Sequence, residues 1–324
     1  MLSRREVLKG AAVAGAAALV RGEGALFASA SQPSTPVNFS VPANACDTHV
    51  HVFGDPQRFP FAPARAYTPE QASIAEMQAL HRALRTERVV IVHPSVYGPD
   101  NSCTLDGMKQ LGSNVRGIAV IDEKTSESAL DEMDRAGMRG IRVNLETTGQ
   151  SDPAIARQRF QEAVDRIKKR SRWHIQVYTR LSVIEGIKDQ VMAAPMPIVF
   201  DHFGGAQAAL GVSQPGFDTL LNLVRTGKTY VKISAPYRSS TKLPDYADVA
   251  PLAKALIGAN PQHILWGSDW PHPASPVAHQ PVTEITPLWQ VDDGRIFNQL
   301  PIWAPDAELR KTILVDNPAK LYGF

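Results

Sequence analysis

The chain has 324 residues, of which 44% are hydrophobic and 20% charged, so it is long enough to bury a substantial core. Its formal net charge is +2, and residues 1–30 supply all of it with four basic and two acidic side chains. The remainder is close to neutral, which argues against a protein that binds nucleic acid or another polyanion.

The first thirty residues predict an export signal. Arg4 and Arg5 precede a weakly apolar run at 11–20, and Ala28-Ser29-Ala30 is typical of a signal cleavage site. This order resembles a twin-arginine signal, which implies the twin-arginine export machinery as a partner and a periplasmic location. The apolar run is shorter than the roughly twenty residues that span a bilayer, so stable membrane insertion is not expected. An uncleaved anchor is the alternative.

Downstream of the signal, which we place at 1–30 with cleavage after Ala30, residues 31–44 are rich in Pro and Ser and are expected to form a linker. Short apolar runs then alternate with amphipathic segments up to residue 324. Eight runs predict strands: CDTHVHVF (46–53), RVVIVHPS (88–95), VRGIAVID (115–122), MRGIRVNL (138–145), WHIQVY (173–178), MPIVFDHF (196–203), TYVKISA (229–235) and HILWGSDW (263–270).

Helical periodicity between these runs predicts helices at 74–84, 129–136, 154–171, 181–192, 217–226 and 246–257. Ser126 and Asp152-Pro153 are expected N-caps. Thr68-Pro69-Glu70-Gln71 likewise offers a capping threonine, with proline at the first helical position.

Eight strand-like runs, each followed by a crossover segment, indicate a parallel sheet. Eight of them within residues 45–324 fit a closed (β/α)8 barrel, so we expect a single α/β domain of this class. An open doubly wound sheet is the alternative, but no glycine-rich phosphate loop follows the first strand. Cys46 and Cys103 form no disulfide framework and lack metal-ligand spacing, so both are expected to be structural.

Barrel enzymes place their catalytic groups where the strands end. That rule collects polar residues from seven predicted strands: His49 and His51; His93 and Ser95; Arg142; Gln176 and Tyr178; Asp201 and His202; Lys232, Tyr237 and Arg238; Ser268, Asp269 and His272. Polar groups gathered in a buried pocket are costly without a function, so the set predicts one active site. For Lys232 an ion pair in the barrel wall is an equal alternative, and Asp201 could equally orient His202.

Four stretches carry a resemblance to a known family: the His-x-His of the first strand, DHFGG at 201–205, GSDWPH at 267–272 and NPAKLYGF at 317–324. They resemble the amidohydrolase superfamily, and most of all its branch containing 2-pyrone-4,6-dicarboxylate lactonase and related lactone hydrolases. The stretch HVFGDPQRFPFAPARAYTPE is especially close to those lactonases, and the likeness runs from residue 45 to residue 324. The resemblance implies a hydrolase that opens a small anionic lactone.

By this resemblance, Asp269 is the general base that takes a proton from the attacking water, and three histidines polarise the lactone carbonyl: His49, His51 and His202. Six further residues occupy positions that resemble substrate-binding ones: Tyr67, Ser95, Arg142, Tyr178, Arg238 and His272. Arg142 and Arg238 suit a carboxylate because a guanidinium offers a planar fork of donors. For Tyr67, packing on the core is an equal alternative.

Two positions depart from the pyrone dicarboxylate lactonases. Those enzymes carry an arginine shortly after the fourth strand, where this chain has Glu146-Thr147-Thr148. They carry another after the sixth strand, where it has His202-Phe203-Gly204-Gly205. A lactone with one anionic group, muconolactone-like or derived from a sugar acid, therefore fits the remaining charges better than the dicarboxylate. Whether it belongs to the catabolism of aromatics or of sugar acids stays open.

A divalent metal is an alternative reading of the same residues. His49, His51, His202 and Asp269 form a nitrogen and oxygen ligand set that suits zinc or manganese. The lactonase branch implies catalysis without metal, so we favour a site with no cofactor. Three other functions stay open: a metal-dependent amidohydrolase or decarboxylase, a lactone isomerase, and an exported binding protein with a decayed active site. The sequence predicts no oligomeric state.

Overall fold

The computed structural model of the chain describes residues 30–147, 149, 152–274, 276 and 279–324. Residues 1–29 of the expected signal at 1–30 lie outside these residues, as does Thr148. No helix in the described ranges is long and apolar enough to cross a membrane.

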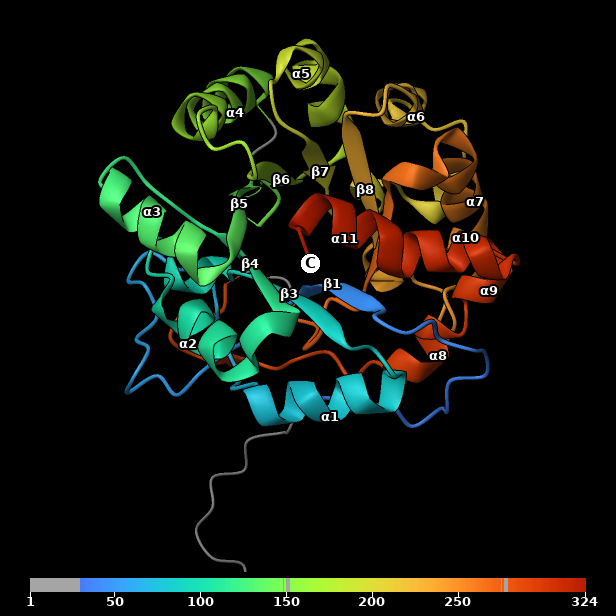
Figure 1. The fold of residues 1–324 in the computed structure, drawn as a ribbon, viewed down its shortest axis with the longest axis horizontal. Helices are drawn as coiled ribbons and strands as arrows, with labels where there is room; N and C mark the ends of the chain where they lie inside the picture. The colour runs from blue at the N-terminus through green and yellow to red at the C-terminus, as the bar shows by residue number, and fades with distance from the viewer. Residues whose placement is uncertain (1–29, 148, 150–151, 275, 277–278) are drawn as a thin grey trace, which may run out of the picture.

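Eight parallel strands form the centre of the fold (Figure 1). They are β1 (Cys46–Val50), β3 (Arg88–Val92), β4 (Val115–Ala119), β5 (Met138–Asn144), β6 (His174–Tyr178), β7 (Ile198–Phe200), β8 (Thr229–Ser234) and β9 (Ile264–Gly267). Each pairs with the next in chain order, and a parallel bridge between Val50 and Trp270 brings the end of β9 back to β1. The predicted (β/α)8 barrel is confirmed, and every strand falls within its predicted run.

Seven helices surround the strands on the outside (Figure 1). They are α1 (Ile74–Leu84), α2 (Ser102–Leu111), α3 (Glu127–Ala136), α4 (Pro153–Ile167), α5 (Leu181–Ala193), α6 (Phe217–Arg225) and α7 (Ala250–Ala259). The sequence signals miss α2, because Asp106 and Gly107 in its middle have low helix propensity. The helix expected at 246–257 begins only at Ala250 in α-helical form, since Tyr246 has a φ of +49°.

The N-caps are confirmed at Ser126 and Asp152, whose side chains accept from Ala129 N and Ala154 N. The third expectation is wrong. Thr68-Pro69 forms the short strand β2 (Thr68–Pro69), which pairs with β10 (Ile285–Thr286).

Helix α1 is instead capped by Ser73, and the local sequence explains why. Ser73 accepts from Glu76 N, and the Glu76 carboxylate accepts from Ser73 N, so the glutamate three residues on completes a capping box. Glu70 is occupied elsewhere, since its carboxylate accepts from Leu288 N at 2.9 Å. The segment before α1 is therefore tied to the loop that follows β9.

The C-terminal part of the chain closes one end of the barrel. It contains α8 (Asp293–Phe297), α9 (Leu300–Trp303), α10 (Ala307–Lys311) and α11 (Asn317–Tyr322). Figure 1 shows α11 running across the barrel, and Arg116 near the start of β4 donates to the carbonyls of Tyr322 and Gly323. Leu321 and Tyr322 pack with Cys46 and other apolar residues of the barrel interior. The carboxyl ends of the strands are left for the functional site.

The segment expected to be a linker packs against the barrel. Ser31 O accepts from Trp270 Nε1 at 3.0 Å, and Ser34 and Thr35 both hydrogen-bond to the Asp292 carboxylate. Residues 31–35 are thereby fastened to the end of β9 and to the start of α8.

Candidate active site

A cavity of about 240 Å³ opens where the strands end. Eight of the ten residues expected in the site line it: His51, Tyr67, Ser95, Arg142, Tyr178, His202, Arg238 and Asp269. His49 is fully buried and contacts Asp269 without lining the cavity. His272 is also fully buried and lies behind Tyr237. The strand-end rule thus brings most of the set to one place.

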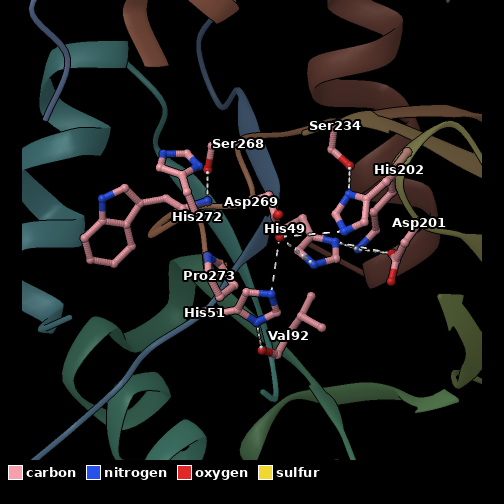
Figure 2. A network of polar contacts seen from close by, with 12 residues as sticks. His49, His51, Val92, Asp201, His202, Ser234, Ser268, Asp269, His272 and Pro273 are labelled. Atoms are coloured by element: carbon pink, nitrogen blue, oxygen red, sulfur yellow. Dashed lines mark hydrogen bonds and ion pairs between the residues drawn. The ribbon is translucent and has the colours of Figure 1, made fainter. Parts of the chain in front are cut away.

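Asp269 stands at the centre of this arrangement, directly after β9. Its backbone N donates to His49 O at 2.8 Å across the barrel seam, and its φ of +66° turns the chain there. Its Oδ1 lies 3.4 Å from His49 Nε2, 3.3 Å from His51 Nε2 and 3.7 Å from His202 Nε2. Figure 2 shows the three rings turned toward this one carboxylate. One oxygen of Asp269 therefore faces three imidazoles.

The other oxygen, Oδ2, is held by two donors. Tyr237 OH donates to it at 2.7 Å and Arg238 Nε at 2.8 Å. Burial opposes ionisation of Asp269, but the positive charge of Arg238 outweighs it and holds the pKa of this carboxyl well below its usual range. Asp269 is therefore a carboxylate at neutral pH, with one oxygen anchored and the other free to act.

The hydrogen bonds of the two cavity histidines differ. His51 Nδ1 lies 2.8 Å from Val92 O, and since a carbonyl only accepts, Nδ1 carries a proton. In a neutral His51 with its proton on Nδ1, Nε2 and Asp269 Oδ1 are both hydrogen-bond acceptors. Their close approach is therefore stable only with a proton or a cation between them. His202 Nδ1 lies 2.8 Å from Ser234 Oγ, and burial lowers the pKa of His202 well below its usual range. Ser234 can donate to Nδ1, which leaves the proton of a neutral His202 on Nε2.

Beneath these rings, His49 lies between a carboxylate and a buried cation. Its Nδ1 is 3.3 Å from Asp201 Oδ1 and 3.4 Å from Lys232 Nζ. Burial lowers the pKa of His49 to about 3, so its ring is neutral. Asp201 therefore orients His49 and not His202, whose Nδ1 is taken by Ser234.

Lys232 is fully buried in the barrel interior. Its Nζ donates to Thr48 O at 2.7 Å and to Gln176 Oε1 at 2.8 Å, and lies 3.8 Å from Asp201 Oδ1. Burial lowers the pKa of Lys232 to about 8. Lys232 thus forms the ion pair in the barrel wall that was one of its two expected roles, and its ammonium also contacts His49.

The carboxylate of Asp201 also holds one of the cavity arginines. Arg142 Nε and Nη2 both lie 3.2 Å from Asp201 Oδ2. Within the described residues, Nη1 of Arg142 and Nη1 of Arg238 have no hydrogen-bond partner. Both guanidinium groups line the cavity and keep donors for a ligand.

His93, which also ends a strand, has a structural role. Its Nδ1 contacts Thr104 Oγ1 at 2.8 Å and its Nε2 contacts Gly98 O at 3.0 Å, so both ring nitrogens are satisfied away from the cavity. Position at a strand end is therefore not sufficient to place a histidine in the site.

The donors around Asp269 fit a divalent metal. His49 Nε2 and Asp269 Oδ1 are buried and, among the described residues, have no hydrogen-bond partner. Two groups have ligand atoms close enough to hold an ion: His49, His51 and Asp269, and His49, Asp201 and His202. Imidazole nitrogen and carboxylate oxygen suit zinc or manganese. The site thus has the ligands for a metal, as the alternative reading of the sequence expected.

Three further residues complete the site without having been assigned a role from the sequence. Ser234 and Tyr237 follow from the strand-end rule, since they lie at and just after the end of β8. Asp293, at the start of α8, contacts His272 Nε2 at 2.9 Å. No motif marks Asp293, because its position depends on the path of the long loop after β9.

The first departure from the lactonase pattern lies at the cavity, and Gly205 of the second borders a neighbouring hollow. Glu146 and Thr147 line the cavity. Glu146 forms a two-pronged ion pair with Arg180, with distances of 3.0 Å to Nε and 2.6 Å to Nη2. A second hollow beside the first is bordered by Glu146, Arg180 and Gln207. The rim thus has a carboxylate where an arginine was expected from the resemblance.

The twin-arginine translocation pathway signal sequence profile matches residues 1–20, which indicates export. The amidohydrolase family profile matches residues 46–324, the whole of the barrel.

Individual proteins agree with the family match. The 4-sulfomuconolactone hydrolase of Rhizobium radiobacter is 35% identical over 290 residues, covering 90% of this chain and 93% of that protein. The 2-pyrone-4,6-dicarboxylate hydrolase of Comamonas testosteroni is 35% identical over 301 residues, covering 90% and 94%. A solved structure assigned as a 2-pyrone-4,6-dicarboxylic acid hydrolase from Pseudomonas putida has a TM-score of 0.73 at 29% identity, covering 87% of this chain and 98% of that one. The chain therefore belongs to the amidohydrolase family.

Proposed function

We propose that the protein is a hydrolase that opens a small lactone carrying one anionic group, with Asp269 as the general base. One observation supports this proposal above the others: an ionised carboxylate lines the cavity with one oxygen anchored by Tyr237 and Arg238 and the other facing three imidazoles. The names of the relatives, which are lactone hydrolases, support the reaction class.

The proposed reaction begins with a water molecule beside Asp269 Oδ1. The carboxylate takes one proton while the water oxygen bonds to the lactone carbonyl carbon. When Ser234 donates to Nδ1, the proton of His202 lies on Nε2, and this Nε2–H donates to the carbonyl oxygen as negative charge develops there. The ring C–O bond then breaks, and the proton held by Asp269 passes to the departing ring oxygen, giving a hydroxy acid.

The metal alternative uses the same residues. His49, His51 and Asp269 have ligand atoms close enough to hold the ion, and a divalent metal held by such ligands would lower the pKa of its bound water toward neutrality.

The charges of the cavity favour a substrate with one anionic group. Arg142 and Arg238 each line the cavity but already face one carboxylate, Asp201 and Asp269. Their free Nη1 donors suit a single carboxylate or sulfonate on the lactone. Glu146 adds negative charge at the rim, which disfavours a second anionic group there. We place the activity in the periplasm, which the signal match supports.

The test is a screen of the mature protein against lactones with one and two acidic groups, followed by Asp269→Asn. We expect the variant to lose at least about 10³-fold in kcat, the scale of general acid–base catalysis, without loss of fold. Asp165→Asn, at an exposed site on α4, is the control and keeps full activity.

Hydrolysis in ¹⁸O-labelled water places solvent oxygen in the product, whereas lactone isomerisation leaves the product unlabelled. Near-normal turnover by Asp269→Asn, or an unlabelled product, would overturn the proposal.

A further inference from the structure

A line of buried polar side chains runs from Asp269 away from the cavity. Tyr237 OH contacts Asp269 Oδ2 at 2.7 Å and His272 Nδ1 at 3.0 Å, and His272 Nε2 contacts Asp293 Oδ2 at 2.9 Å. Asp269, His272 and Asp293 are at most 1% exposed and Tyr237 is 8% exposed. Figure 2 shows His272 on the opposite side of Asp269 from His202. The line therefore contacts Asp269 on the side of its carboxylate that faces away from His202.

The direction of each hydrogen bond follows from the protons available. A carboxylate oxygen accepts, so the Tyr237 hydroxyl donates to Asp269 Oδ2. Among the described residues, the other atom in contact with the Tyr237 oxygen is His272 Nδ1, at 3.0 Å, and it donates to that oxygen when it carries a proton.

This arrangement depends on the partner of His272. If the ring and Asp293 shared a single proton, it would lie on Nε2 against the carboxylate. Nδ1 would then be a bare acceptor and would draw the Tyr237 hydrogen away from Asp269. With two protons on the pair, Nε2 and Oδ2 share one across 2.9 Å and Nδ1 keeps the other.

We propose that Asp293 and His272 are positioning residues that turn the Tyr237 hydroxyl toward Asp269 and so keep Asp269 Oδ1 aimed into the cavity. The proposal rests on the proposed role of Asp269 as the base. It replaces the expectation that His272 binds substrate, since two side chains separate it from the reacting atoms. Asp293, which no sequence motif marks, is the residue of this hydrogen-bonded line farthest from the cavity.

The experiment is a double-mutant cycle. Tyr237→Phe is expected to lower kcat about 10–100-fold, the scale for groups that orient a reacting side chain, with KM unchanged. His272→Leu should lower kcat similarly in the native background and have no further effect in the Tyr237→Phe background, because it acts only through that hydroxyl. His272→Asn, whose amide can donate from the position of Nδ1, should recover part of the loss.

The matched control is Asp292→Asn, one residue before Asp293 at the start of α8, which should keep native kcat. A wild-type kcat for Tyr237→Phe, or an equal loss from His272→Leu in both backgrounds, would overturn the positioning chain. Turnover by Asp269→Asn would instead overturn the proposed base. If His272→Leu fails to fold, Tyr237→Phe and His272→Asn still decide the question.

Discussion

Arg238 Nε lies 2.8 Å from Asp269 Oδ2, and Arg238 Nη2 donates to Pro273 O at 2.9 Å. The guanidinium is thus fixed by the loop after β9, and its charge is the main influence that keeps Asp269 ionised. Asp269 itself raises the pKa of Arg238 well above its usual range, although burial of the guanidinium opposes this. The two groups form one buried unit that includes the proposed general base.

The first prediction concerns Arg238→Gln. Removing the cation leaves burial to dominate, so the pKa of Asp269 rises and the base is ionised only at higher pH. The acid limb of kcat/KM should move to higher pH, and kcat/KM at neutral pH should fall about 100-fold as anion binding is also lost. A pH profile of the variant from pH 4 to 9 tests this. An unshifted acid limb would contradict the assignment of Arg238.

The second prediction concerns the proton of His202. Ser234→Ala removes the hydroxyl that faces His202 Nδ1 at 2.8 Å and frees the ring to place its proton on either nitrogen. We expect kcat to fall about tenfold with little change in KM, because the donor to the carbonyl oxygen acts mainly in the transition state. Steady-state kinetics measures both constants. Ser239→Ala, at a buried serine of the neighbouring turn, serves as the control and should leave kcat unchanged.

The strand-end rule predicts more of this site than of its surroundings. His49, His51 and Asp269 follow directly from strands whose apolar runs are unambiguous, and the barrel brings these ends together. Thr68-Pro69 misleads because its role depends on pairing with β10, far along the chain. Asp293 could not be predicted for the same reason, because a long loop sets its position and no local periodicity encodes the path of that loop. Local signals thus predict the elements, whereas contacts between loops need the structure.

The third prediction tests the charge of the rim. Glu146→Arg replaces a carboxylate that lines the cavity with the cation that the resemblance led us to expect. Together with Arg180, it would favour a second anionic group on the lactone. The preference for a dicarboxylate over a monoanionic lactone, measured as a ratio of kcat/KM, should rise about tenfold, or 1.4 kcal/mol. Glu132→Arg, at an exposed site on α3, should leave the ratio unchanged.

The fourth prediction concerns zinc affinity. Lys232 Nζ lies 3.4 Å from His49 Nδ1, on the ring whose Nε2 faces Asp269. A buried ammonium so close disfavours a second cation at that ring, so Lys232→Met should tighten zinc binding about tenfold. Calorimetric titration of metal-free protein measures the affinity without reference to activity. Lys228→Met, at an exposed lysine, is the control, and equal affinities for Lys232→Met and native protein would refute the expectation.

The last prediction concerns the segment that follows the signal. Burial alone would raise the pKa of Asp292, but hydrogen bonds from Thr35 and Ser34 outweigh it and lower this pKa to about 2. Those bonds form only when residues 34–35 lie against the start of α8. The folded pKa is below the unfolded value of about 3.9, so this contribution to stability is present above about pH 4. It is lost as the pH falls toward 2.

Asp292→Asn should therefore be less stable than the native protein at pH 6, with the difference shrinking as the pH falls to 3. Thr35→Val, which removes one donor to the same carboxylate, should lose about 1 kcal/mol at pH 6, below the range for bonds to a fully buried charged group because Asp292 is only half-buried. Urea unfolding at the two pH values measures both. A loss that is the same at pH 3 and pH 6 would show that Asp292 acts through packing and not through its charge.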